Sequence, residues 1–185
     1  MLANTITIAR TVLTFAVIAL FGHQRALSIA LIFTIAVIFA LDAVDGYIAR
    51  KRNETSKLGE VLDTLADRII ENTFWVYFTA TGQLPVWMPI IVMARGFITD
   101  ALQRTHGYPT NGWTHALTRS RISRAISGIT KMLAFTSLAT APVFNNPHLE
   151  AASLRLATLA VGFCLLRGLP FLFSIPAIKM QPDRH

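Results

Sequence analysis

Six apolar stretches dominate the chain, and each is about as long as a helix that crosses a bilayer. They cover residues 6–22, 26–49, 58–81, 85–104, 120–142 and 152–175. A helix rises about 1.5 Å per residue, so roughly 20 apolar residues cross a hydrocarbon core about 30 Å thick. With 53% hydrophobic and 15% charged residues, the chain is also too apolar for an ordinary soluble domain. The sequence therefore predicts an all-α integral membrane protein with six transmembrane helices, in a single domain over residues 1–185.

The basic residues are concentrated in alternate connections between these stretches. One side of the predicted membrane carries Arg50, Lys51, Arg52, Lys57, Arg104, Arg119, Arg121, Arg124, Lys179 and Arg184, whereas the other carries Arg25 and little else. By the positive-inside rule, we expect both termini in the cytoplasm. The net charge of +7 is then mostly a topology signal, and a nucleic-acid partner is not expected.

Seven of the ten acidic residues lie between residues 41 and 73, where the second stretch ends and the third begins. They are Asp42, Asp45, Glu54, Glu60, Asp63, Asp67 and Glu71. At about 100° per residue, positions 42, 45, 46 and 49 share one helical face, and positions 59, 63 and 67 share a face of the next helix. Because a short basic loop joins the two helices as antiparallel neighbours, we expect a cluster of four aspartates near the cytoplasmic surface.

Four carboxylates in a membrane need compensation, because they would cost roughly 10 kcal/mol if each were deep and unpaired. Pairing with Arg50 or Arg68 is one explanation. Divalent cations are the explanation that the residue types favour, since Mg²⁺ takes oxygen ligands and leaves positions for substrate phosphates. Two such ions would neutralise four aspartates and could clamp a phosphoryl group.

The spacing of these residues resembles a family signature. The pattern Asp42-x2-Asp45-Gly46-x2-Ala49-Arg50-x8-Gly59-x3-Asp63-x3-Asp67 matches every fixed position of the CDP-alcohol phosphatidyltransferase signature, and the Asn4-x2-Thr7-x2-Arg10 start is similar to that of many bacterial members. The resemblance implies a six-helix membrane enzyme, often a homodimer, with its active site at the cytoplasmic side. It implies transfer of a phosphatidyl group from CDP-diacylglycerol to an alcohol with release of CMP, in a prokaryotic inner or plasma membrane.

The resemblance also implies roles for individual residues. Asp42, Asp45, Asp63 and Asp67 would bind one or two Mg²⁺ ions, for which Mn²⁺ often substitutes, and Asp67 would be the general base for the acceptor hydroxyl. Five of the other matched positions would bind the CDP-lipid: Gly46 and Gly59 by close approach, Arg50 through phosphate, and Thr7 and Asn4 through the nucleotide. Glu60 and Glu71 receive no role.

A second group of charges points to a phosphorylated acceptor. Arg121, Arg124 and Lys131 share a face of the fifth stretch, and Arg95 in the fourth is a further candidate. The alternative is that these are flanking charges and that Lys131 pairs with an acid such as Asp100. A phosphorylated acceptor favours glycerol 3-phosphate, as in phosphatidylglycerophosphate synthases, with inositol phosphate or another polar acceptor as the alternative.

Two departures leave the acceptor open. Phosphatidylglycerophosphate synthases commonly show an Arg-Glu pair where this chain has Arg95-Gly96, and their Gly-x-x-Lys-Thr pattern is only echoed by residues 128–131. A small cation transporter would also line a membrane cavity with acids, but arginine beside a cation path would repel the cargo. A scaffold that holds lipid without turnover is a third possibility. Release of CMP distinguishes the enzyme from both.

Overall fold

The computed structural model describes residues 2–51, 57–106, 114, 117–118 and 120–173, and leaves out the side chains of residues 2–3, 43, 45–51, 57–58, 60, 106, 121 and 172–173. Its helices are α1 (Leu2–Leu20), α2 (Arg25–Lys51), α3 (Lys57–Ala80), α4 (Trp87–His106), α6 (Arg121–Phe144) and α7 (Pro147–Phe173). Each predicted stretch corresponds to one of these helices. The all-α prediction is therefore confirmed for the described part of the chain.

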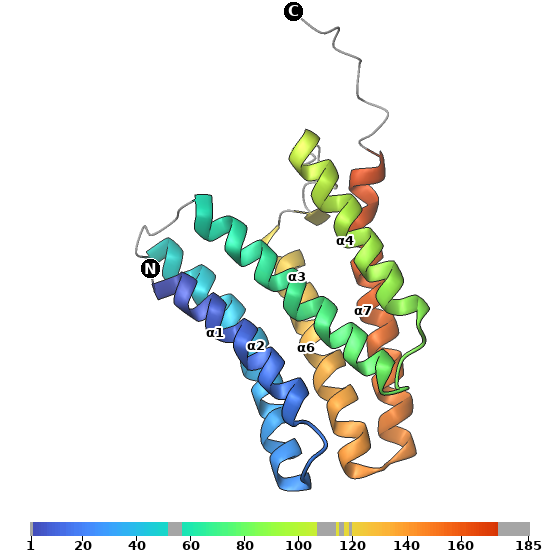
Figure 1. Ribbon diagram of the computed structural model, residues 1–185. Coiled ribbons are helices and arrows are strands. Elements are labelled where there is room, and N and C mark those ends of the chain that lie inside the picture. Colours follow the sequence, from blue (N-terminus) through green and yellow to red (C-terminus); the bar gives the residue numbers. More distant parts are fainter. Residues whose placement is uncertain (1, 52–56, 107–113, 115–116, 119, 174–185) are drawn as a thin grey trace, which may run out of the picture.

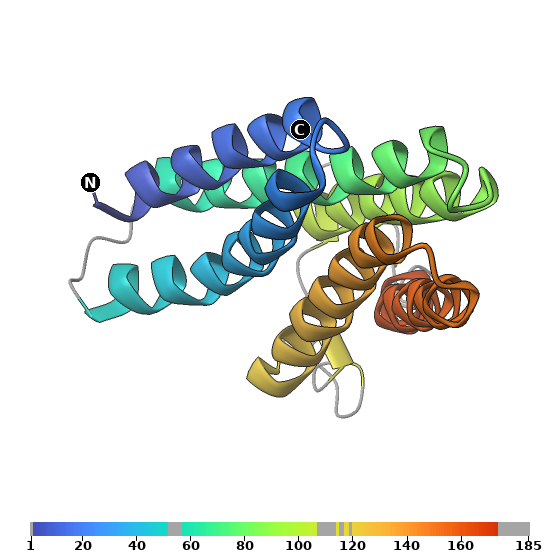
Figure 2. The same ribbon diagram turned by 90° about the horizontal axis from the view of Figure 1, so that it is seen from below.

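Successive helices run in opposite directions (Figure 1). Helices α1, α3 and α6 start toward the upper end in that view, and α2, α4 and α7 return to it. Helix α6 packs against both α2 and α7, and it lies between them when the molecule is seen from below (Figure 2). Helix α3 contacts α1 and α4, and α4 also contacts α7. This alternation brings the start of α3 and the end of α2 to the same side of the bundle.

An aromatic cluster holds the middle of the bundle together. Phe74, Trp75 and Phe78 of α3 surround Phe135 of α6, with ring centroids 5.1 to 6.0 Å from it, and Phe39 of α2 lies 5.6 Å away. All but Phe39 are almost fully buried. Aromatic side chains bury large areas and prefer such offset and edge-on contacts. The cluster therefore fixes α2, α3 and α6 relative to one another, two turns along α3 from Asp67.

Within the described residues, two helices are long and apolar enough to cross a membrane. These are the stretches Arg25–Asp42 and Pro147–Phe171, with mean hydropathies of 2.0 and 1.6, and α1 contributes a shorter apolar stretch, Asn4–Leu20. Only 22% and 28% of the two longer stretches is buried inside the protein. Their apolar side chains thus face mostly outward, unlike those of a core helix in a soluble domain.

The helix that corresponds to the fifth stretch ends two residues beyond the predicted residue 142. Helix α6 passes through Pro142 and ends at Phe144, where Asn145 adopts a left-handed conformation with φ 48° and ψ 49°. Proline lacks the N–H that a helix uses one turn back, but one missing bond in the last turn is tolerated. Pro147 then opens α7, because proline suits a first helical turn.

Candidate active site

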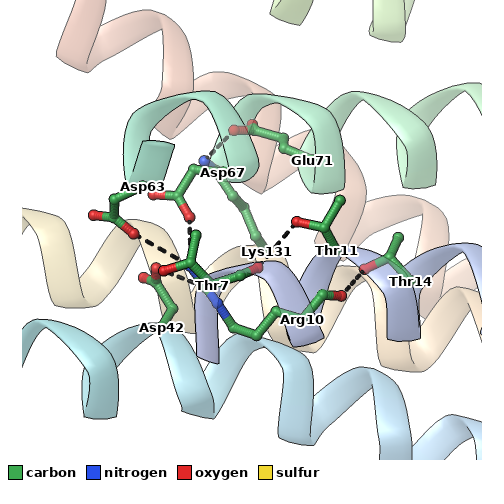
Figure 3. Close-up of polar contacts among 9 residues, drawn as sticks. All are labelled: Thr7, Arg10, Thr11, Thr14, Asp42, Asp63, Asp67, Glu71 and Lys131. Carbon is green, nitrogen blue, oxygen red and sulfur yellow. Dashed lines mark hydrogen bonds and ion pairs between the residues drawn. The ribbon is translucent and has the colours of Figure 1, made fainter. Parts of the chain in front are cut away.

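Three aspartates from two helices meet beside the aromatic cluster. Asp42 comes from α2, and Asp63 and Asp67 come from one face of α3, four residues apart (Figure 3). Each offers a carboxylate oxygen, and these oxygens all lie within 4.8 Å of one another. Carboxylate oxygens at this separation suit one hard divalent cation. The three acids, called here the acidic group, therefore have the chemistry that a metal site requires.

Arg10 of α1 provides the counter-charge of the acidic group. Its Nη1 lies 2.8 Å from Asp42 Oδ1, and its Nη2 lies 3.3 Å from Oδ1 of both Asp63 and Asp67. The sequence suggested Arg50 or Arg68 as partners, but Arg68 pairs elsewhere and the Arg50 side chain lies outside the description. The sequence did contain a signal for Arg10, because it is the single arginine of the apolar stretch 6–22 and a charge in such a stretch needs an acidic partner.

A cavity of about 390 Å³ joins the acidic group to a set of basic side chains. This basic group consists of Arg68, Arg95, Arg124, Lys131 and Arg167. Three of its members, Arg95, Arg124 and Lys131, were expected to bind the acceptor, and the structure places all three in the cavity wall. The side chain of Arg121, the fourth, lies outside the description.

Two carboxylates pair with the basic group. Lys131 Nζ lies 2.6 Å from Oε2 of Glu71, which is 5% exposed, and Arg68 Nη1 lies 3.8 Å from the same oxygen. Arg68 makes a two-pronged contact with Asp100, with its Nη2 and Nε donating over 2.7 and 2.9 Å. Lys131 thus pairs with an acid, as the alternative interpretation held, but the acid is Glu71 and not Asp100. Glu71, which had no assigned role, is a buried partner of two cations.

Two glycines, which have no side chain, leave space for two of the arginines. A Cβ on Gly168 would lie 3.0 Å from Cγ and Nε of Arg95, and a Cβ on Gly96 would lie 3.3 Å from Nη1 of Arg68. The glycine that follows Arg95 therefore accommodates Arg68. Arg167, which sequence reasoning missed, donates from Nη2 to the Thr118 carbonyl over 3.4 Å. The signal for it was an arginine deep in the apolar stretch 152–175, far from Arg155 near the start of that stretch.

The residues expected to bind the CDP-lipid are not part of the cavity wall, or their side chains lie outside the described residues. Thr7 is buried one turn from Arg10 on α1, and Figure 3 draws it close to the acidic group. Neither Thr7, Asn4 nor Gly59 lines the cavity. The side chains at Asp45, Gly46 and Arg50 lie outside the description, so the fourth predicted metal ligand stays a prediction.

Comparison with known proteins identifies the family. A model of the CDP-alcohol phosphatidyltransferase family matches residues 1–166. The chain belongs to the CDP-alcohol phosphatidyltransferase family. Because this family is membrane-associated, and two apolar helices of the chain face mostly outward, the chain is a membrane protein.

Individual relatives match shorter stretches. The chain is 37% identical over 71 residues to a cardiolipin synthase (CMP-forming) of Streptomyces coelicolor, covering 37% of this chain and 33% of that protein. It is 35% identical over 74 residues to a CDP-diacylglycerol–glycerol-3-phosphate 3-phosphatidyltransferase of Bacillus subtilis, covering 40% and 37%. It is 30% identical over 105 residues to a protein of that name from Rickettsia typhi, covering 55% and 58%. The chain thus covers from a third to somewhat over half of these relatives.

Proposed function

We propose that the protein transfers a phosphatidyl group from CDP-diacylglycerol to glycerol 3-phosphate and releases CMP. The observation that carries the proposal is that the acidic and basic groups line one cavity. The acidic group has the ligand chemistry for a metal that binds pyrophosphate, and the basic group has the charge for a second phosphate. The names of the Bacillus subtilis and Rickettsia typhi relatives support the same pair of substrates.

In the proposed reaction an acceptor oxygen attacks the phosphorus that carries diacylglycerol. A new P–O bond forms to the acceptor, the P–O bond to CMP breaks, and the acceptor proton passes to Asp67. Asp67 suits the role of base because its side chain is about half exposed toward the cavity. Catalysis by the chain itself would then consist of positioning and proton transfer.

The proposed metal site comprises Asp42, Asp63 and Asp67, with Asp45 as a fourth ligand. When bound there, one or two Mg²⁺ or Mn²⁺ ions would stabilise the negative charge of the pyrophosphate and the negative charge that develops on the departing CMP. Three clustered carboxylate oxygens support this assignment. Of the remaining signature residues, Gly46, Arg50, Gly59, Thr7 and Asn4 are proposed to hold the CDP portion.

The charge of the basic group supports a phosphorylated acceptor. Its five cations are opposed by two carboxylates, Glu71 and Asp100, which leaves three positive charges around the cavity. A phosphate dianion would balance most of that excess, and arginine forks suit phosphate oxygens. Serine or an uncharged polyol would leave it unbalanced. Inositol phosphate is the alternative that satisfies the same charges.

We also propose that all six helices cross the membrane in a single domain, with both termini and the active site at the cytoplasmic side, and that the enzyme acts as a homodimer in a prokaryotic inner or plasma membrane. Exposed apolar side chains on α1, α2, α4, α6 and α7 support contact with lipid along the bundle. The charged cavity residues of α3, α4 and α6 point inward, which would allow these helices to lie in a bilayer.

The reaction is tested by mixing purified protein with CDP-diacylglycerol and Mg²⁺ and measuring CMP release. The acceptors, added one at a time, are glycerol 3-phosphate, inositol phosphate, phosphatidylglycerol, glycerol and serine. We expect release with glycerol 3-phosphate, its loss in Asp67→Asn and in EDTA, and normal release in Glu150→Gln, an exposed acid on α7. Arg124→Gln should raise the acceptor KM, whereas Arg155→Gln, on an exposed part of α7, should not. No CMP with any acceptor, together with Mn²⁺ flux into protein-loaded vesicles, would favour a transporter.

A further inference from the structure

We propose that Arg10 is a built-in counter-ion of the acidic group. It holds Asp42, Asp63 and Asp67 together before a divalent cation binds, and it competes with that cation for them. The inference rests on the proposed function in one respect, namely that the acidic group is the metal site. It adds a residue outside the proposed metal ligands and a reason for the strength of metal binding.

The position of Arg10 shows that the contact is built into the fold. Arg10 is 2% exposed, whereas the three carboxylate side chains are 43% to 47% exposed. The guanidinium therefore reaches the carboxylates from the buried side, and their accessible surface faces the cavity, which all four residues line. The carbonyl of Arg10 also accepts a 2.9 Å hydrogen bond from Oγ1 of Thr14, which is buried one turn further along α1.

A planar fork is what this arrangement requires. Nη1 contacts α2 through Asp42, and Nη2 contacts α3 through Asp63 and Asp67, so a single side chain ties α1 to two neighbours (Figure 3). Guanidinium donors have a fixed geometry, unlike the point charge of a lysine. Without this bridge, the three carboxylates, whose oxygens lie within 4.8 Å of one another, would repel one another and push Asp42 of α2 away from Asp63 and Asp67 of α3.

The charges determine the direction of the effect on metal binding. Among the described side chains, three carboxylates and one guanidinium carry two net negative charges, the charge that one divalent cation neutralises. Removing Arg10 would leave three negative charges and remove a positive charge that lies within a few ångströms of any ion bound by the same side chains. We expect the repulsion between two cations at such distances to outweigh the gain from holding the ligands in place. Loss of Arg10 should therefore tighten metal binding while it weakens the metal-free protein.

A function follows for this competition. With Arg10 in place, the acidic group binds a divalent cation weakly on its own. The pyrophosphate of a CDP-lipid would add negative charge at the same position and would therefore strengthen metal binding. Arg10 thus couples occupancy of the metal site to binding of the nucleotide lipid. When metal and lipid are both absent, Arg10 offsets the repulsion between Asp42 of α2 and the aspartates of α3.

The test measures Mn²⁺ binding by the free-ion EPR signal, together with thermal unfolding, on the full chain in detergent. We expect Arg10→Gln to bind Mn²⁺ at least tenfold more tightly than the wild type. Without metal it should unfold at a lower temperature, and Mn²⁺ should raise its unfolding temperature more than it raises that of the wild type. Arg10→Lys keeps the charge and should bind Mn²⁺ within about threefold of the wild type. Arg155→Gln, at an exposed arginine of α7, is the control for loss of one positive charge away from the acidic group.

Unchanged or weaker Mn²⁺ binding by Arg10→Gln would overturn the inference. If that variant folds only with metal, both proteins are purified with Mn²⁺ and titrated with EDTA. We then expect Arg10→Gln to need about ten times more EDTA than the wild type to lose the same fraction of its Mn²⁺. If both proteins need the same amount of EDTA, Arg10 does not compete with the metal. Because the readout is metal binding, tighter binding in a protein that releases no CMP would refute the proposed reaction and leave this inference standing.

Discussion

Replacing Lys131 with methionine should destabilise the protein by leaving the carboxylate of Glu71 buried. The two charges are 2.6 Å apart, with side chains 19% and 7% exposed. Removing one partner of a buried ion pair typically costs about 3 to 5 kcal/mol, most of it from the charge left behind. Arg68 stays 3.8 Å from the same oxygen, so we expect the low end, about 3 kcal/mol.

A double-mutant cycle separates this effect from lost packing. Glu71→Gln combined with Lys131→Met removes both charges, so the double variant should recover about 2 kcal/mol relative to Lys131→Met alone. Free energies of unfolding are measured by denaturant titration in detergent, with the exposed Arg155→Met expected to stay within about 0.5 kcal/mol of the wild type. A double variant as unstable as the sum of the two single variants would refute the explanation, because the charge of Glu71 would then have no part in the loss.

Two further substitutions test how the basic group is held. Gly168→Ala places a Cβ 3.0 Å from the Arg95 side chain, so Arg95 must move and the acceptor KM should rise severalfold with the KM for CDP-diacylglycerol unchanged. An equal rise in both KM values in steady-state kinetics would show that Arg95 does not act on the acceptor alone. Arg68→Lys loses one of two hydrogen bonds to Asp100 and should cost about 1 kcal/mol of unfolding free energy by denaturant titration. No loss would mean that a single bond suffices there.

The helices could be predicted from the sequence because the length of an apolar stretch is a local property. Each predicted stretch matched one helix of the bundle. The errors fell at the ends, where capping and proline position decide. Proline removes only the hydrogen bond to the carbonyl one turn before it, so α6 passes Pro142 and ends two residues later, at Phe144.

The acidic group could be predicted in part because helical periodicity fixes which residues share a face. Asp63 and Asp67 are four residues apart, and a short connection brings Asp42 toward them. The counter-charges could not be predicted, because they come from distant parts of the chain. Arg10 is separated from Asp67 by 57 positions, and Lys131 from Glu71 by 60. Local spacing indicated that these charges needed partners, but the packing of α1 and α6 on α3 selects them.

Helix α3 forms the boundary between the two charged groups, and this sets a length for the acceptor. Asp67 belongs to the acidic group, and Glu71, one turn further on, pairs with Lys131 of the basic group. One helical turn is about 5.4 Å. A three-carbon chain bridges that distance, so a hydroxyl at Asp67 and a phosphate near Lys131 could belong to one molecule of glycerol 3-phosphate.

The same spacing predicts an order of acceptors. Shortening the acceptor to 2-hydroxyethyl phosphate should lower kcat/KM for CMP release, because its hydroxyl cannot reach Asp67 while its phosphate stays with the basic group. Lengthening it to 4-hydroxybutyl phosphate should lower kcat/KM less, since a longer chain can fold to fit. If the two-carbon acceptor reacted as well as glycerol 3-phosphate, the phosphate would have to bind closer to the acidic group than the basic group allows. The assignment of Lys131 to the acceptor would then be wrong.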